Sequence, residues 1–142
     1  MLLIGFKMAS PKITTEVENA ILQWNETDVE NSDFGARVFL FRRKEFGHIH
    51  QNGDLDIVFG KQMTAELLQH KFVKQHLYVP SVGITYSVSS EDKLSFAVSL
   101  LRFSYLIHSI NANKNDTVSQ VIFENEMAKL PESLSSIYFK PK

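Results

Sequence analysis

Residues 36–59 constrain the fold most, because three short stretches of alternating apolar residues are joined there by tight turns. The stretches span residues 36–41, 44–50 and 54–59. Alternation with period two is typical of strands that bury one face. The Asn52-Gly53 pair before the third stretch readily supplies the positive φ of a hairpin turn. We therefore predict three strands in an antiparallel meander.

Helical patterns surround this meander. Ser10 and Pro11 form a helix-start signal, and Ser89 with Asp92 forms a capping-box pattern. The expected helices span 11–24, 61–72 and 89–110, and the expected fourth strand spans 82–88. Helices that are grouped apart from an antiparallel sheet define an α+β class. We predict a four-stranded, mainly antiparallel sheet covered by two or three helices.

Length and composition indicate one domain. The chain has 142 residues, 44% of them hydrophobic, which suits a single core. The polar stretch 111–116 is the clearest linker, so we expect a poorly ordered leader over 1–9, one domain over 10–110, and a linker with a short helical tail over 111–142. No run approaches the roughly 20 apolar residues that cross a membrane, and no signal-peptide pattern opens the chain. We expect a soluble cytoplasmic protein.

Charge and residue types exclude several functions. Lys plus Arg is 15 and Asp plus Glu is 16, a balance that argues against nucleic-acid binding unless a local basic patch forms. Arg37, Arg42, Arg43 and Lys44 would have to supply that patch. The chain has no cysteine, which excludes disulfides, a thiol nucleophile and thiolate metal ligands. Phosphate-loop and dinucleotide motifs are absent.

The densest group of chemically capable residues lies around the second strand. His48 and His50 should project from one strand face about 7 Å apart, together with Phe46. His76 precedes the fourth strand, and Asp56 faces away from the apolar side of the third. Three imidazoles and a carboxylate suit zinc or ferrous iron, a pocket for a polar small molecule, or plain hydrogen bonding at a strand end. We assign no metal and no cofactor, and adopt the pocket as the working interpretation.

Arg102 interrupts an otherwise apolar helix. A guanidinium in that position either pairs with a buried carboxylate, for which Asp56 is the candidate, or reaches a pocket and binds an anion.

Four segments in this order resemble the small family of bacterial and fungal proteins labelled "luciferase domain" or "luciferase-like". They are Phe46-Gly47-His48-Ile49-His50, Asp54-Leu55-Asp56-Ile57-Val58-Phe59, His76-Leu77-Tyr78-Val79-Pro80-Ser81-Val82-Gly83 and Leu100-Leu101-Arg102-Phe103-Ser104-Tyr105. The resemblance covers about residues 12–108. It implies a compact α+β domain and marks His48, His50, Asp56, His76, Arg102 and Tyr105 as positions that match the family pattern. Many members have tryptophan where this chain has Ile84. The resemblance supplies no substrate, cofactor or catalytic residue.

We expect a small polar or anionic ligand in a pocket lined by His48, His50 and His76, with Arg102 as the partner of an anion. Whether any reaction is catalysed is left open. We do not expect light emission, because a filled core of this size leaves little room for a large apolar substrate. The competing hypothesis is an interaction module or homodimer, formed by an exposed sheet face or by the tail after Asn111.

Overall fold

The computed structural model describes residues 11–140. Its helices are α1 (Pro11–Ile21), α2 (Lys61–Leu68), α3 (Leu94–Ala112), α4 (Thr117–Ala128) and α5 (Glu132–Phe139), and its strands are β1 (Thr27–Asn31), β2 (Arg37–Phe41), β3 (Lys44–Ile49), β4 (Asp54–Val58), β5 (Lys74–Gln75) and β6 (Gly83–Ser87). A single 3-10 turn, η1 (Glu91–Lys93), precedes α3. The expected leader over 1–9 and the cap at Ser10 lie outside the described residues.

All six strands form one antiparallel sheet in the order β1-β2-β3-β4-β6-β5. The α+β class is confirmed, but the expected number of strands was wrong by two. Strand β1 has the sequence Thr-Asp-Val-Glu-Asn, and β5 has only two residues. In β1 only Thr27 and Val29 are half-buried, and both residues of β5 are exposed, so neither edge strand carries the run of alternating apolar residues that reveals a central strand. The described part of the chain has five α-helices, of which α4 and α5 lie in the segment expected to be a linker with a short helical tail.

The turn between β2 and β3 places two arginines in an unusual conformation. Arg42 and Arg43 both have positive φ, 47° and 69°, as in the tight hairpin turns that usually use Asn and Gly. Arg42 pairs with Glu26 at 2.8 Å, and Arg43 pairs with Glu30 on β1 at 2.9 Å. Arg37 likewise pairs with Glu18 at 2.6 Å. The arginines expected to supply a basic patch are therefore paired with carboxylates.

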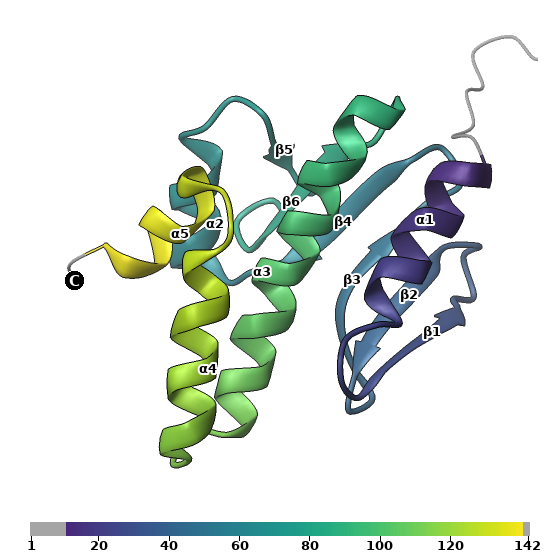
Figure 1. Ribbon diagram of the computed structural model, residues 1–142. Coiled ribbons are helices and arrows are strands. Elements are labelled where there is room, and N and C mark those ends of the chain that lie inside the picture. The colour runs from purple at the N-terminus through teal and green to yellow at the C-terminus, as the bar shows by residue number, and fades with distance from the viewer. Residues whose placement is uncertain (1–10, 141–142) are drawn as a thin grey trace, which may run out of the picture.

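Helices α1 and α3 pack on the same face of the sheet, and α4 runs along α3 (Figure 1). The buried side chains of these elements form one hydrophobic cluster, which also contains Phe123 and Met127 of α4 and Leu134 of α5. Full burial of each such side chain contributes roughly 1.5–3 kcal/mol. The residues expected to form a tail thus share the apolar cluster of the sheet and α3.

Four helix boundaries differ from the expected ones, and two of them belong to α3, which spans Leu94–Ala112 rather than 89–110. Helix α1 ends at Ile21 rather than 24, and α2 ends at Leu68 rather than 72. The expected capping box at Ser89 was wrong, because Ser90 precedes η1 and its hydroxyl donates to the side chain of Asp92. Neither η1 nor α3, which begins at Leu94, has a side-chain cap hydrogen bond.

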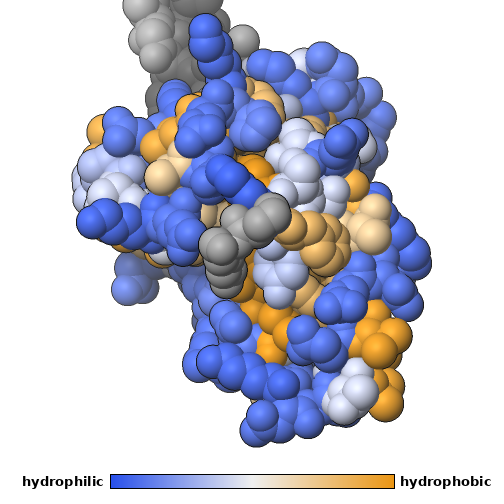
Figure 2. Space-filling model, turned by 90° about the vertical axis from the view of Figure 1, so that its left-hand side faces the viewer, coloured by the Kyte–Doolittle hydropathy of each residue, from blue (hydrophilic) through white to orange (hydrophobic). Residues whose placement is uncertain are grey.

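None of the helices described by the structure is long and apolar enough to cross a membrane. Figure 2 shows the side of the molecule that carries α4 and α5, where hydrophobic groups are separated by hydrophilic ones. Val118, Val121 and Ile122 of α4 are exposed. The homodimer expected from the tail stays a prediction.

Candidate functional site

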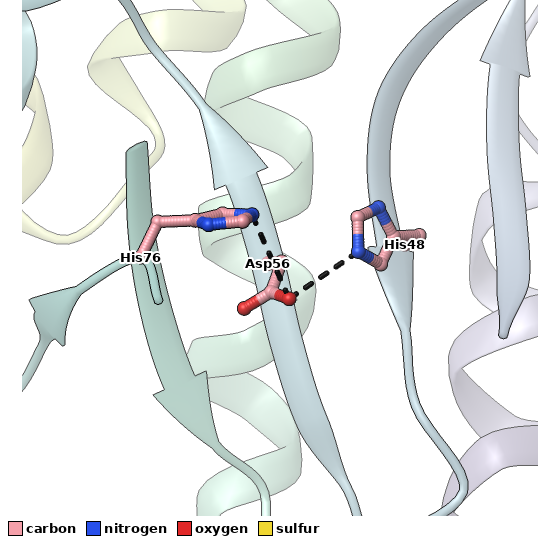
Figure 3. Close-up of side chains that lie close together, drawn as sticks. All are labelled: His48, Asp56 and His76. Atoms are coloured by element: carbon pink, nitrogen blue, oxygen red, sulfur yellow. Dashed lines mark ion pairs between the residues drawn. The ribbon is translucent and has the colours of Figure 1, made fainter. Parts of the chain in front are cut away.

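The site is built on one row of residues that runs across the sheet. His48 of β3 is the cross-strand partner of Asp56 on β4, and Asp56 is the partner of Thr85 on β6. Directly opposed residues of antiparallel strands share a face, so these three side chains meet. Their face is the one turned away from α3, which lies behind the sheet in Figure 3.

A β-bulge in β3 sets the direction of His48. Phe39 pairs with Gly47 but Leu40 pairs with Glu45, so Phe46 is an extra residue on β3. The expectation that Phe46 shares a face with His48 was wrong, because the bulge turns Phe46 into the core, where its ring packs near Trp24 and Tyr105. The hydroxyl of Ser104 on α3 donates to the carbonyl of Phe46 at 2.7 Å and holds the bulge.

Three imidazoles converge on one oxygen of Asp56. The Nε2 atoms of His48, His50 and His76 lie 3.3, 2.7 and 3.7 Å from Oδ2 of Asp56. The hydroxyl of Thr85 donates to Oδ1. Asp56 is only 8% exposed. Burial favours the neutral acid, but hydrogen bonds from His48, Thr85 and His50 outweigh it and hold the pKa of Asp56 well below its usual range.

His48 carries a proton on both ring nitrogens at neutral pH. Its Nδ1 donates to Oε2 of Glu45 at 2.7 Å, while its Nε2 faces Asp56. Burial favours the neutral ring, but the hydrogen bonds to Asp56 and Glu45 prevail and raise the pKa of His48 to about 9. His48 and Asp56 therefore form a half-buried imidazolium–carboxylate pair.

His76 is fixed in one tautomer by the backbone that follows it. Its Nδ1 accepts hydrogen bonds from the N–H groups of Tyr78 and Val79, at 3.1 and 3.3 Å. A ring nitrogen that accepts carries no proton, so the proton of the neutral ring lies on Nε2. His76 therefore directs an N–H group toward Asp56. His48 and His76 lie on opposite sides of that carboxylate (Figure 3).

Gly83 leaves the space that His76 occupies. A Cβ at Gly83 would lie 3.0 Å from Cβ and 3.2 Å from Cδ2 of His76, and 3.2 Å from the carbonyl oxygen of Ile57. Gly83 is therefore a point of close approach between β6 and His76.

We expect Gly83→Ala to displace the His76 ring and to lower the free energy of unfolding by about 1–2 kcal/mol, because the added methyl group overpacks this contact. Ring ¹⁵N spectra should show a changed His76 signal, while His70, which is not among the nearest neighbours of the added Cβ, serves as the internal control. An unchanged His76 signal would contradict the account of Gly83.

The cluster forms the floor of a hollow of about 520 Å³, which is lined by Phe34, His48, His50, Asp56, His76 and Tyr78. Sites for small molecules commonly have volumes of about 300–1,000 Å³. A neighbouring hollow of about 420 Å³ shares His50, Asp56 and Tyr78 with the first and adds Lys74 and Leu77. The open face of the sheet thus offers a polar floor with room above it.

Arg102 and Tyr105 lie in a different place. The guanidinium of Arg102 pairs with Glu126 of α4 at 2.9 Å and stands 5.1 Å above each of the rings of Trp24 and Tyr105. The hydroxyl of Tyr105 donates to the carbonyl of Asn25 at 2.9 Å. The expected pairing of Arg102 with Asp56 was therefore wrong. The structure brings His48, His50, Asp56 and His76 together and leaves Arg102 and Tyr105 on the helical side of the sheet.

Four residues of the site were not anticipated from the sequence: Glu45, Thr85, Phe34 and Tyr78. A signal for Thr85 existed, because it alternates with buried Ile84 and Tyr86 and so had to face the same side as Asp56 once the strands were paired. Glu45 reaches His48 only because of the bulge, and a bulge leaves no plain mark in the sequence. Phe34 and Tyr78 come from connections between strands, where alternation gives no direction.

A protein-family model described as "Luciferase domain" matches residues 43–104, which is less than half of the chain. The resemblance to this family is confirmed, over a narrower range than the expected 12–108. The matched range runs from the β2–β3 turn into α3 and includes His48, His50, Asp56 and His76. No curated protein and no solved structure matches the chain. The chain is therefore an α+β protein that resembles the luciferase-domain family, and no reaction follows from that resemblance.

Proposed function

We propose that this protein binds a small polar molecule in the hollow above Asp56. The convergence of three imidazoles from separate stretches of chain on one ionised carboxylate is the observation that carries the proposal. Buried ion pairs stabilise a fold no better than well-packed apolar side chains do. Four titratable residues gathered at the floor of a hollow are therefore better explained by a ligand than by stability.

The charges favour a neutral or cationic ligand over an anion. The carboxylates of Asp56 and Glu45 both contact His48, whose imidazolium is the matching cation. Arg102, the residue expected to attract an anion, is engaged by Glu126. A ligand that donates a hydrogen bond would find its acceptor in Asp56, and a ligand oxygen would find donors in the imidazole N–H groups.

A divalent metal ion is the second candidate. One ligand atom from each of His48, Asp56 and His76 lies within 4.8 Å of the others, and Glu45 could orient His48 as carboxylates orient zinc-bound imidazoles. A metal on Nε2 of His76 would require a proton on Nδ1, where two backbone N–H groups now donate. We rank the metal second for that reason.

Both candidates can be tested in one titration of the full chain followed by ring ¹⁵N spectra. The probes are ethanolamine, propane-1,2-diol, inorganic phosphate and zinc chloride. We expect the two hydroxyl compounds to shift the signals of His48, His50 and His76 at lower concentration than phosphate does, because the site offers no excess positive charge. His70 and His108 lie outside the hollow and serve as internal controls.

Three variants show whether the probes bind at the proposed site. His50→Gln should weaken the response to the hydroxyl compounds, whereas His108→Gln should leave it unchanged. Stoichiometric zinc that shifts only His48 and His76, and that is lost in Asp56→Asn, would select the metal instead. A site that responds to none of the four probes would refute both candidates.

A further inference from the structure

We propose that the molecule held above Asp56 carries a flat aromatic ring with a hydroxyl or N–H group at its edge, as a phenol does. This inference rests on the proposed function and names the class of its ligand. Three features of the hollow support it: two exposed rings, their contacts with the histidines that flank the carboxylate, and the polarity of the floor.

Two aromatic side chains of the hollow are exposed to solvent to an unusual degree. Phe34 is 64% exposed and Tyr78 is 81% exposed, and Leu77 beside Tyr78 is exposed as well. Large apolar side chains that gather around a polar cluster on a protein surface commonly mark a binding site. Both rings line the same hollow as the histidines, so a ligand in it would cover them.

The two rings approach the cluster from different connections. The ring centroid of Phe34, from the β1–β2 connection, lies 5.5 Å from that of His48. The centroid of Tyr78, from the β5–β6 connection, lies 6.3 Å from that of His76. His48 and His76 stand on opposite sides of Asp56 (Figure 3). Phe34 and Tyr78 therefore each lie beside a histidine on a different side of the carboxylate, and both are aromatic walls of the same hollow. Aromatic walls favour a flat ring over a bulky aliphatic one.

The floor between these walls requires a group that both donates and accepts hydrogen bonds. Asp56 is an ionised acceptor, while His50 and His76 present Nε2–H donors beside it. A phenolic hydroxyl satisfies both, because its hydrogen can be given to Asp56 and its oxygen can accept from an imidazole. A carboxylate in the same position would meet Asp56 with like charge.

The test compares phenol, cyclohexanol and benzoate, which have six-membered rings of similar size. Dissociation constants are taken from the shifts of the His48, His50 and His76 ring signals in the full chain at pH 7. We expect phenol to bind about 5-fold more tightly than cyclohexanol, which is the order of an aromatic contact, and more tightly than benzoate. Phe34→Leu and Tyr78→Leu should each remove most of the preference for phenol over cyclohexanol.

Phe139→Leu is the matched control, because Phe139 is also exposed, at 48%, but lies on α5 away from the hollow. Equal affinities for phenol and cyclohexanol that neither Phe34→Leu nor Tyr78→Leu alters would overturn the aromatic inference and leave the proposed function standing. Tighter binding of benzoate than of phenol would overturn the neutral hydroxyl or N–H group. If none of the three compounds shifts the histidine ring signals but ethanolamine does, only this inference is refuted. If no probe shifts them, the inference and the proposed function are both refuted.

Discussion

Asp56→Asn should lower the free energy of unfolding by about 3 kcal/mol at pH 6.5, because it removes the buried carboxylate on which the three imidazoles converge. The asparagine keeps the shape of the side chain, so the loss reports charge rather than packing. Urea unfolding followed by circular dichroism, in buffer with EDTA, measures it. The loss should exceed that of any other single substitution of a polar residue at the site.

The difference in free energy of unfolding between the wild type and Asp56→Asn should depend on pH with a definite sign. The folded-state pKa of His48 is raised from 6.5 to about 9, so the stability it contributes is fully present below pH 6.5 and is lost as the pH rises through about 9. The folded-state pKa of Asp56 is depressed, so its contribution is lost only as the pH falls below the usual range of an aspartate. The gap between the wild type and Asp56→Asn should therefore narrow between pH 6.5 and 9.

Asp54→Asn is the matched control for this experiment. Asp54 begins the same strand, but its oxygens accept from the neutral groups of Ser87 and Asn52. The asparagine side chain keeps one accepting oxygen and no imidazole faces it, so this replacement should cost less, about 1 kcal/mol. Equal effects at Asp54 and Asp56, or a gap that stays constant from pH 6.5 to 9, would contradict the central role of Asp56.

Gly47→Ala should destabilise the fold by about 2 kcal/mol through overpacking. A Cβ at Gly47 would lie 2.6 Å from Cδ2 of Leu101 on α3 and 3.3 Å from Cγ1 of Ile57. Both neighbours are almost completely buried, so they have little space into which to move. Chemical denaturation of the variant gives the free energy.

A double-mutant cycle with Leu101→Ala identifies the cause of that loss. Truncation of Leu101 removes Cδ2, the atom with which a Cβ at position 47 would clash. Gly47→Ala should therefore cost much less in the Leu101→Ala background than in the wild type. Additive effects of the two substitutions would show that contact with Leu101 of α3 is not the cause of the destabilisation.

The sequence allowed the central strands and the histidine cluster to be predicted for the same reason. Alternate positions of β2, β4 and β6 carry large apolar side chains of the core: Phe39 and Phe41, Leu55 and Ile57, Ile84 and Tyr86. The direction of Asp56 followed from its place between Leu55 and Ile57, which are buried. Two histidines two residues apart near the end of one strand could then be placed beside it.

What escaped prediction depends on contacts that are distant in sequence. Strand β1 is polar and forms because β2 offers it a partner. Phe46 points into the core because a bulge interrupts the alternation of β3, and Ser104, far along the chain, satisfies the carbonyl released there. Arg102 pairs with Glu126 of α4, in a segment that the sequence suggested to be a tail. Local patterns carry no information about such pairings.

The two outer strands also limit how copies of this chain can associate. Strand β5 offers an incoming strand only two residues, and β1 carries carboxylates, of which Glu30 pairs with Arg43. Charged or very short edge strands commonly protect a sheet against strand pairing between molecules and against fibril growth. The inner strands β2, β3 and β4 are thereby enclosed within the sheet. Self-assembly by strand exchange would first have to displace the outer strands.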